Sequence, residues 1–558
     1  MVLSSTLRPF RFLFLLWLLS TFLFGLPAKI EQFIAQSGIP SSEISLYIKP
    51  LGAKEPLFTL NPDTTRTPAS VIKVLTTYAS LLKLGFDYRW PTYFYYTGKI
   101  KRGVLKGNLY VKGMGDPTLS SGVIDSLVEQ IRQKGIRAIE GNIVIDRSFF
   151  QVGKENNSGF DKNRYSPYNA MPDAMMFNER ISKMVVDPKH HTIQKRSPDE
   201  SYTIVNDIEW VNRSCRGRYS WPRVLVREEG GTPKVRFYGK LSQKCHKQTI
   251  QKVITQPCWG FYGALVWGLK AKGIEVKGTM RLAKVPKRAK KLFTHYSQRL
   301  EEIVSKTAKK SNNLYARQLL LFLGAQRYGA PATLKKGRDA IKHILRNNGV
   351  ASVNKLLIDN GCGLSRRAKV TAHALADVYE SAYRHYGQRW LNTLSIAGVD
   401  GTIKRRFRGS VVAKRAWMKT GTLKHVKNIG GYLLGRSGVR YVVVILVNSH
   451  KPNYLASQLQ NRILKWLVRY SPPQNIRNLK VAPIKQGRYY LQLGHFQNHP
   501  DAQYLQEVRR LGFPYELRKE EGYRLLLGPY AFKDEAKEAL LRARRRLDSG
   551  VFLLKEIQ

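Results

Sequence analysis

The stretch PASVIK, from Pro68 to Lys73, places a serine three residues before a lysine where an apolar helical pattern begins. Apolar residues recur at helical spacing as far as Leu82, and Gly85 lies where such a helix would end. Two side chains three positions apart on a helix share one face. A serine is a strong nucleophile only when a base takes its proton, and a lysine is such a base only if burial or another cation lowers its pKa. The stretch therefore allows two interpretations: Lys73 is the base of a nucleophilic Ser70, or it is only a solvated charge.

The SxxK pattern by itself selects nothing, because the chain contains it at three places: Ser70/Lys73, Ser80/Lys83 and Ser352/Lys355. Ser80 lies inside the same predicted helix, where its backbone N–H bonds the preceding turn. Ser70 lies at the helix start, where N–H groups are free to stabilise an oxyanion. Ser352 follows no clear helix start, and we expect an ordinary surface turn there. Position in the helix therefore selects Ser70.

Two further motifs carry polar groups, one at a predicted helix start and one on a predicted strand. Ser311-Asn312-Asn313 stands at another helix start and, taken alone, is typical of a helix N-cap. Lys419-Thr420-Gly421-Thr422 lies on a predicted strand, where a lysine and hydroxyls suit a substrate carboxylate and Gly421 would let a substrate backbone lie against the strand edge. Taken alone, the second motif equally fits a surface lysine beside a turn.

In this order, the SxxK, SxN and KTG motifs resemble the serine acyltransferase family of penicillin-binding proteins and serine β-lactamases. The interval from Ser70 to Ser311 is far longer than in compact β-lactamases. It resembles the D-alanyl-D-alanine carboxypeptidase/endopeptidase branch, the low-molecular-mass class C penicillin-binding proteins. The stretches LYVKGMGDPTL, DNGCGLSR and AGVDGT strengthen this resemblance. The family usually has Ser where Cys362 stands, a departure that we expect to leave catalysis untouched.

The resemblance implies catalytic roles for Ser70, Lys73 and Ser311, with Lys419 and Asn313 in supporting roles. Ser70 would attack the carbonyl between the two terminal D-alanines of a peptidoglycan stem peptide, and Lys73 would accept its proton. Lys419 would keep Lys73 neutral by cation repulsion. Ser311 would relay a proton to the departing amine, while Asn313 would hold the substrate amide.

The resemblance also implies a substrate-binding role for the KTG strand. Lys419, Thr420 and Thr422 would orient the terminal carboxylate, with Gly421 leaving room at the strand edge. The backbone N–H groups of Ser70 and Thr422 would form the oxyanion hole. No cofactor and no metal ligand is implied.

A chain of 558 residues with 43% hydrophobic content is too long for one ordinary domain, and we expect two to four units. We expect an α/β (α+β) core of the serine β-lactamase/DD-peptidase type with a large, mostly β insert, followed by a small C-terminal domain. Asp173 in the insert is either a turn residue or a substrate contact. The predicted boundaries are 1–28 for a signal peptide or anchor, 29–95 and 286–470 for the core, 96–285 for the insert, 471–487 for a linker, and 488–558 for the terminal domain.

The terminal domain contains two similar strand-like runs, YYLQLGHF and YRLLLGPY, and a helical pattern follows each of them. This duplicated βα arrangement resembles a SPOR domain. The resemblance implies binding to glycan strands stripped of stem peptides at division sites.

The charge balance and the N-terminus bear on location. Lys and Arg exceed Asp and Glu by 55, which predicts attraction to polyanions without choosing among them. Arg8 and Arg11 precede an apolar run from Phe12 to Leu26, a pattern that favours a secretory signal over an uncleaved membrane anchor. Export to the periplasm or cell envelope makes nucleic acid an unexpected partner and confines membrane contact to this segment. Export also permits a disulfide, for which Cys215 and Cys245 are the preferred pair, with unpaired buried thiols as the alternative.

Together these features predict an exported serine-type D-alanyl-D-alanine carboxypeptidase/endopeptidase that acts on peptidoglycan through an acyl-enzyme on Ser70. Its expected partners are stem peptides and glycan strands, β-lactam antibiotics as covalent inhibitors, and division-site proteins. Two alternatives stay open at this point: a catalytically slow peptidoglycan-binding scaffold, and a β-lactamase.

Overall fold

The protein is described from a computed structural model that covers residues 26–151, 159–197, 199, 201–229, 232–254, 256–484, 487–511, 513–519, 521–530 and 533–557. The predicted signal or anchor lies almost wholly outside these residues. Within the described ranges, no helix combines the length and the apolar character that crossing a membrane requires.

The core is built on one antiparallel sheet with the strand order β18-β19-β20-β21-β1-β2. The predicted hairpin turn from Gly435 to Gly438 is confirmed, since it joins two strands in register. The paired strands predicted at residues 45–60 are confirmed as well. The strand bounds are β1 Ile44–Pro50, β2 Phe58–Leu60, β18 Ser395–Ile396, β19 Ala416–Leu423, β20 Val426–Leu434 and β21 Arg440–Asn448.

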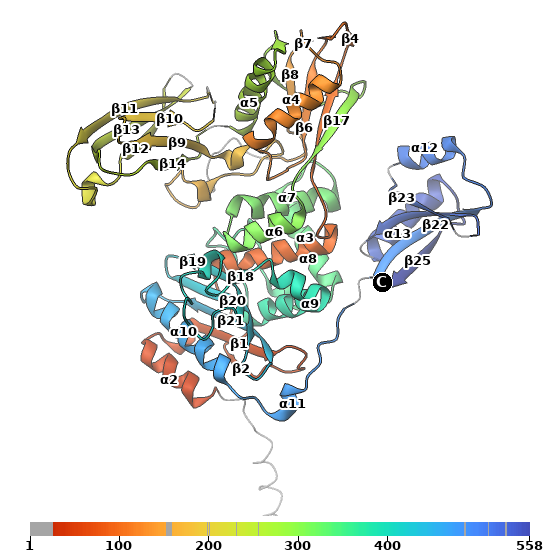
Figure 1. Cartoon of the computed structure of the whole chain (residues 1–558). Coiled ribbons are helices and arrows are strands. Elements are labelled where there is room, and N and C mark those ends of the chain that lie inside the picture. The colour runs from red at the N-terminus through yellow and green to blue at the C-terminus, as the bar shows by residue number, and fades with distance from the viewer. Residues whose placement is uncertain are drawn as a thin grey trace, which may run out of the picture.

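Helices cover both faces of this sheet (Figure 1). Alternate residues of β21 explain why, since Val442 and Val444 pack into the large helical cluster while Val443 and Ile445 pack into a second cluster on the opposite face. A strand covered on both faces reads as a continuous apolar run. The second face is covered by α2 Ala28–Ser37 and α10 Asn453–Arg469; the large cluster contains α3 Lys73–Leu84, α6 Leu300–Lys309, α7 Asn313–Tyr328, α8 Leu334–Asn347 and α9 Ala372–Leu391.

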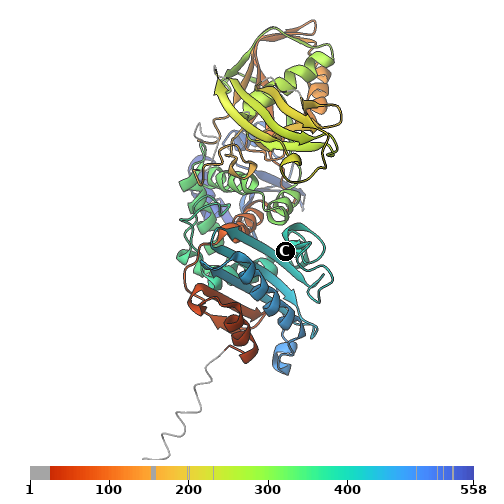
Figure 2. The ribbon, with the colours of Figure 1, turned by 90° about the vertical axis from the view of Figure 1, so that its left-hand side faces the viewer.

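The insert lies beyond the helices α3, α6, α7 and α8, on the side away from the core sheet (Figures 1 and 2). One part contains the sheets β16-β8-β6-β3-β17 and β15-β7-β5-β4. It comprises β3 Pro91–Tyr96, β4 Lys99–Lys101, β5 Val104–Lys106, β6 Leu109–Gly113, α4 Ile124–Gln133, β7 Ala138–Ile139, β8 Ile143–Asp146, α5 Pro257–Ala271, β15 Glu275–Val276, β16 Met280–Leu282 and β17 Lys290–Tyr296. Strands β3 and β17 pair within this sheet although they lie partly or wholly outside the predicted 96–285.

The other part of the insert consists of two three-stranded sheets, β10-β9-β14 and β11-β13-β12. The disulfide between Cys215 and Cys245 lies here, with the Cα atoms 5.1 Å apart, which confirms the preferred cysteine pair. Cys258 and Cys362 are buried thiols. The strands are β9 Ser182–Asp187, β10 Thr192–Lys195, β11 Thr203–Val211, β12 Arg223–Glu229, β13 Thr232–Ser242 and β14 Gln248–Lys252.

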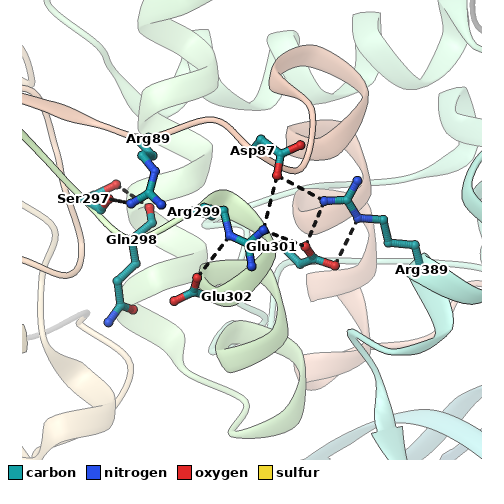
Figure 3. A network of polar contacts seen from close by, with 8 residues as sticks. All are labelled: Asp87, Arg89, Ser297, Gln298, Arg299, Glu301, Glu302 and Arg389. Atoms are coloured by element: carbon teal, nitrogen blue, oxygen red, sulfur yellow. Dashed lines mark hydrogen bonds and ion pairs between the residues drawn. The ribbon is translucent and has the colours of Figure 1, made fainter.

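Two crossovers connect the core with the insert, one after α3 and one before α6. They run side by side, because the backbone N–H of Ser297 donates to the carbonyl of Trp90 at 3.0 Å. Beside them lies the polar network of Figure 3, in which Arg389 at the end of α9 binds Glu301 at 2.9 Å and Asp87 at 3.2 Å. The network links the crossovers to α6 and α9.

The C-terminal unit is an antiparallel sheet of order β23-β24-β22-β25 with two helices packed on one face. The predicted duplicated βα order is confirmed, as β22 is followed by α12 and β24 by α13. Two strands, β23 and β25, complete the sheet. The bounds are β22 Gly487–Phe496, α12 Ala502–Arg510, β23 Tyr515–Lys519, β24 Tyr523–Tyr530, α13 Lys533–Arg546 and β25 Phe552–Ile557.

The segment between the core and this unit follows the core surface (Figure 1). It contains the short helix α11 Gln474–Arg477, and the N–H of Ile484 donates to the carbonyl of Arg384 at 2.8 Å. Helix α13 then faces the core, where Glu538 forms an ion pair with Arg327 at 3.1 Å and Glu535 pairs with Lys83. The predicted domain boundaries themselves stay predictions.

Candidate active site

Ser70 lies in a single 3-10 turn, Ala69–Ile72, that continues into α3. The Nζ atom of Lys73, one helical turn later, is 2.8 Å from the Ser70 hydroxyl oxygen, and Lys73 is fully buried. The sequence therefore predicted the meeting of these two side chains correctly. Ala69 holds a positive φ of 48°, which turns the chain sharply into the helix.

Lys73 has two further partners, both of which can only accept its hydrogens. These are the Oδ1 atom of Asn313 at 2.7 Å and the carbonyl oxygen of Cys362 at 2.5 Å. A neutral amine has two hydrogens and one lone pair. If these two acceptors take the hydrogens, the lone pair faces the hydroxyl of Ser70. The arrangement therefore suits a lysine that receives the proton of Ser70.

Burial lowers the pKa of Lys73 to about 8; Cys362 acts against this shift, and repulsion from Arg317 adds to it. Burial also lowers the pKa of Lys419 well below its ordinary value, with repulsion from Lys73 as the second cause. The sequence assigned to Lys419 the role of keeping Lys73 neutral. The repulsion between Lys73 and Lys419 is the interaction that this role uses, and Arg317, which the sequence did not single out, is a further cation that lowers the pKa of Lys73.

The Lys-Thr-Gly motif lies on β19, the first strand of the hairpin β19–β20. This strand lies against the turn that carries Ser70. A Cβ atom on Gly421 would be 2.6 Å from the carbonyl oxygen of Pro68 and 3.0 Å from the backbone nitrogen of Ser70. Only glycine allows this close approach. Thr422 on the same strand is exposed, and its hydroxyl oxygen accepts from Nζ of Lys427 at 3.2 Å.

Lys419 connects this strand to the SxN motif. Its Nζ atom is 3.0 Å from the hydroxyl oxygen of Ser311 and 2.8 Å from the carbonyl oxygen of Thr420. The hydroxyl of Thr420 donates to that of Thr402 at 2.9 Å. Lys419 is fully buried, so its ammonium group is not exposed at the edge of strand β19.

The SxN motif forms the start of α7, as the N-cap pattern predicts, and the capping residue is Asn312. Its Oδ1 atom accepts from the backbone N–H of Tyr315 at 3.0 Å. Ser311 has a positive φ of 55°, which turns its side chain towards Lys419. The Nδ2 atom of Asn313 donates to the carbonyl of Tyr168 in the insert at 3.0 Å. The motif thus joins both lysines to the insert.

The structure excludes the other SxxK serines from this site. Ser80 is buried inside α3 and donates to the carbonyl of Thr76 at 2.8 Å. Ser352 lies in the short 3-10 helix Ala351–Lys355, and Lys355 pairs with Asp63 at 3.1 Å. Both observations agree with the predictions that Ser80 lies inside a helix and that Ser352 lies in a turn.

Of the two readings that the sequence left open for Asp173, the turn residue is confirmed and the substrate contact is not. Its side chain is fully buried, pairs with Arg147 and accepts from the N–H of Met175 at 3.0 Å. A carboxylate enclosed in this way cannot contact a substrate. Its backbone N–H donates to Gln318 of α7 at 3.1 Å, so this segment supports the helix.

Besides Arg317, sequence reasoning missed three contributors to the site. The stretch DNGCGLSR drew notice for its side chains, but the contribution of Cys362 is its backbone carbonyl. Every residue type has such a carbonyl, so the sequence gives no signal for it. Tyr168 and Glu179 come from the insert, and nothing local in their sequence connects them with a motif more than a hundred residues away.

The fold and these side chains together define a serine peptidase of the penicillin-binding class: a lysine-paired serine at a helix start, an SxN turn and a Lys-Thr-Gly strand beside it. The chain belongs to the D-Ala-D-Ala carboxypeptidase 3 (S13) family, whose model matches residues 26–470. Residues 485–553 match the SPOR domain.

Two curated relatives cover most of the chain. D-alanyl-D-alanine carboxypeptidase DacB of Haemophilus influenzae is 27% identical over 426 residues, which are 75% of this chain and 88% of the relative. The D-alanyl-D-alanine carboxypeptidase of Actinomadura sp. (strain R39) is 27% identical over 409 residues, which are 70% of this chain and 75% of the relative. The crystal structure of penicillin binding protein 4 from Haemophilus influenzae superposes with a TM-score of 0.68 at 24% identity, over 79% of this chain and 99% of that one. The fold predicted from the sequence is thereby confirmed.

Proposed function

We propose that this protein is an exported serine-type D-alanyl-D-alanine carboxypeptidase that acts on peptidoglycan stem peptides through an acyl-enzyme on Ser70. The observation that carries the proposal is the 2.8 Å contact between Ser70 and the buried Lys73, whose pKa is lowered to about 8. A lysine with a pKa near the working pH is an effective general base. The names of the curated relatives support the substrate class.

In the acylation step, Ser70 attacks the carbonyl between the two D-alanines while its proton passes to Lys73. The backbone N–H groups of Ser70 and Thr422 stabilise the oxyanion; Gly421, which has no side chain, lets the strand lie against the turn that carries Ser70. Asn313 donates to the substrate amide once its present contact with the Tyr168 carbonyl is exchanged.

The leaving D-alanine is handled by the groups around Ser311. The hydroxyl of Ser311 gives its proton to the departing amine and takes one from the Lys73 ammonium, while Lys419 contacts the Ser311 oxygen at 3.0 Å. Thr420 and Thr422 orient the terminal carboxylate from the strand edge, while Lys419 contributes positive potential from behind them when it is protonated. Water then hydrolyses the acyl-enzyme.

The test is incubation of the purified protein with muropeptides, with products identified by mass. We expect loss of one terminal D-alanine from pentapeptides, and cleavage of cross-linked dimers if the protein is also an endopeptidase. Ser70→Ala is the inactive control, and Ser80→Ala is the matched active control. Unchanged muropeptides with rapid hydrolysis of penicillin would instead indicate a β-lactamase.

Localisation and partners form a second part of the proposal. We propose that the N-terminal segment exports the protein to the periplasm or cell envelope, and that the SPOR domain directs it to glycan strands at the division site. The acquisition of β-lactam adducts on Ser70 follows from the same acyl-enzyme chemistry. Deleting residues from Tyr489 onward should leave penicillin acylation intact and abolish localisation. Unchanged localisation of the truncated protein would contradict the targeting role.

A further inference from the structure

Glu179, in the short turn Asn178–Arg180 of the insert, binds the catalytic helix start directly. Its Oε2 atom accepts from the side-chain amide of Asn312 at 2.8 Å. Its Oε1 atom accepts from Nζ of Lys306 at 2.6 Å and from the hydroxyl of Tyr315 at 3.3 Å. One carboxylate thus engages the N-cap residue of α7, the first turn of α7, and α6.

The backbone around Glu179 is unusual. Asn178, Glu179 and Arg180 all have positive φ angles, of 47°, 53° and 56°. Left-handed backbone is unfavourable for residues with a Cβ atom, and consecutive examples persist only where the surroundings hold them. Here Asn178 accepts from the N–H of Ser121 at 3.0 Å, which fixes the turn from the insert side. The cost of this conformation is offset by contacts that aim Glu179 at α7.

The consequence concerns the residues on either side of Asn312. Asn312 can cap α7 only if its Oδ1 atom points to the N–H of Tyr315, and the bond from Nδ2 to Glu179 sets that orientation. Ser311 precedes Asn312 with a positive φ, and Asn313 follows it as a partner of Lys73. A rotation of the Asn312 side chain would therefore disturb both catalytic neighbours.

We infer that Glu179 is a positioning residue for catalysis: by fixing the cap residue Asn312, the insert holds Ser311 and Asn313 in place for the reaction of Ser70. The inference rests on the proposed function, because it assigns catalytic work to the SxN motif. Glu179 itself is separated from the reacting atoms by Asn312 and acts through that residue.

The experiment measures the rate of acylation of Ser70 by a fluorescent penicillin in the full-length protein. Glu179→Ala removes all three contacts, and we expect acylation to slow about tenfold or more, since small misplacements of catalytic groups have effects of this size. Glu179→Gln keeps one acceptor oxygen and should recover part of the rate. The matched control is Glu228→Ala. This change also removes an ion-paired carboxylate of the insert, since Glu228 pairs with Arg164 at 3.4 Å on the surface. We expect wild-type acylation for the control.

A double-mutant cycle separates positioning from general support of the fold. If Glu179 acts through Asn312, then Glu179→Ala adds little to the slowing caused by Asn312→Ala, because coupled residues are not additive. Additive effects, or wild-type acylation in Glu179→Ala, would overturn the inference. If Glu179→Ala does not fold, the comparison of Glu179→Gln with wild type decides: an unchanged rate rejects the inference, and a slower rate at an unchanged melting temperature supports it. Failure of the wild-type protein to acylate would contradict the proposed function instead, so the two outcomes are distinguishable.

Discussion

The catalytic site and the C-terminal unit use positive charge in opposite ways. In the site, Lys73 and Lys419 are fully enclosed, and burial lowers the pKa of each. In the C-terminal unit, the arginines at the end of α13, residues 544–546, are exposed to solvent. Exposed charges interact weakly and are screened by salt, whereas a buried amine changes its chemistry. The comparison teaches that the net charge of +55 says little about reactivity, which depends on where a cation lies.

The largest effect should come from changing the buried base. Lys73→Arg keeps a positive charge, but a guanidinium does not give up its proton at working pH and therefore cannot act as a base. We expect acylation by penicillin to fall by about a thousandfold or more, which is the usual size of a general-base contribution. Fluorescent labelling of the purified variant measures this. Lys419→Arg is the companion variant and should keep partial activity, because its proposed role needs charge and not proton exchange. Comparable rates in Lys73→Arg and wild type would remove Lys73 as the base.

The pH dependence of acylation should follow the lowered pKa of Lys73, which is about 8. Below this pH the ammonium form dominates and cannot accept the proton of Ser70. The rate should therefore rise by about tenfold per pH unit from pH 6 towards 8 and then level off. Stopped-flow acylation at constant ionic strength measures the profile, with circular dichroism as a check on folding. A rate that is flat, or that falls as pH rises, would contradict a neutral lysine base.

A smaller effect is expected when salt is raised during glycan binding. If the C-terminal unit recognises glycan with a shaped site, binding of Ser70→Ala protein to glycan without stem peptides should weaken only modestly at high salt. Loose charge attraction would fade instead, because about 0.15 M salt already screens exposed charges beyond roughly 8 Å. Sedimentation with purified glycan measures binding, and the protein truncated before Tyr489 is the control. Equal binding to any polyanion would mean that the unit is a generic basic module.

The smallest effect should follow from breaking the ion pairs that join α13 to the core. Glu535→Gln with Glu538→Gln removes the partners of Lys83 and Arg327, which are partly exposed pairs of low individual strength. We expect unchanged acylation and faster proteolytic cleavage in the segment 471–486, measured by limited trypsin digestion. The single change Glu516→Gln, on the sheet and away from α13, is the control. A slower acylation rate in the double variant would show that docking of the terminal unit reaches the catalytic site.

Local spacing explains why much of the molecule could be predicted. The helix after Ser70 and the hairpin of β20 and β21 follow from apolar periodicity and turn residues, which act over a few positions. The pairing of β3 with β17 could not be predicted in this way, because the two strands lie far apart in the sequence. The insert is mostly β, as expected, and the sequence did not single out α4 and α5, which pack in the core of one of its two parts.

The sequence by itself determined the order of the three motifs, the choice of Ser70 over Ser80, and the duplicated strand–helix order of the terminal unit, because each depends on residues close together in the chain. Only the tertiary structure decided that Asn313 and the carbonyl of Cys362 share Lys73, and that Glu179 reaches Asn312. The physical reason is that desolvation and hydrogen-bond partners arise where distant segments meet. A lysine's pKa is therefore set by neighbours that its own sequence does not reveal.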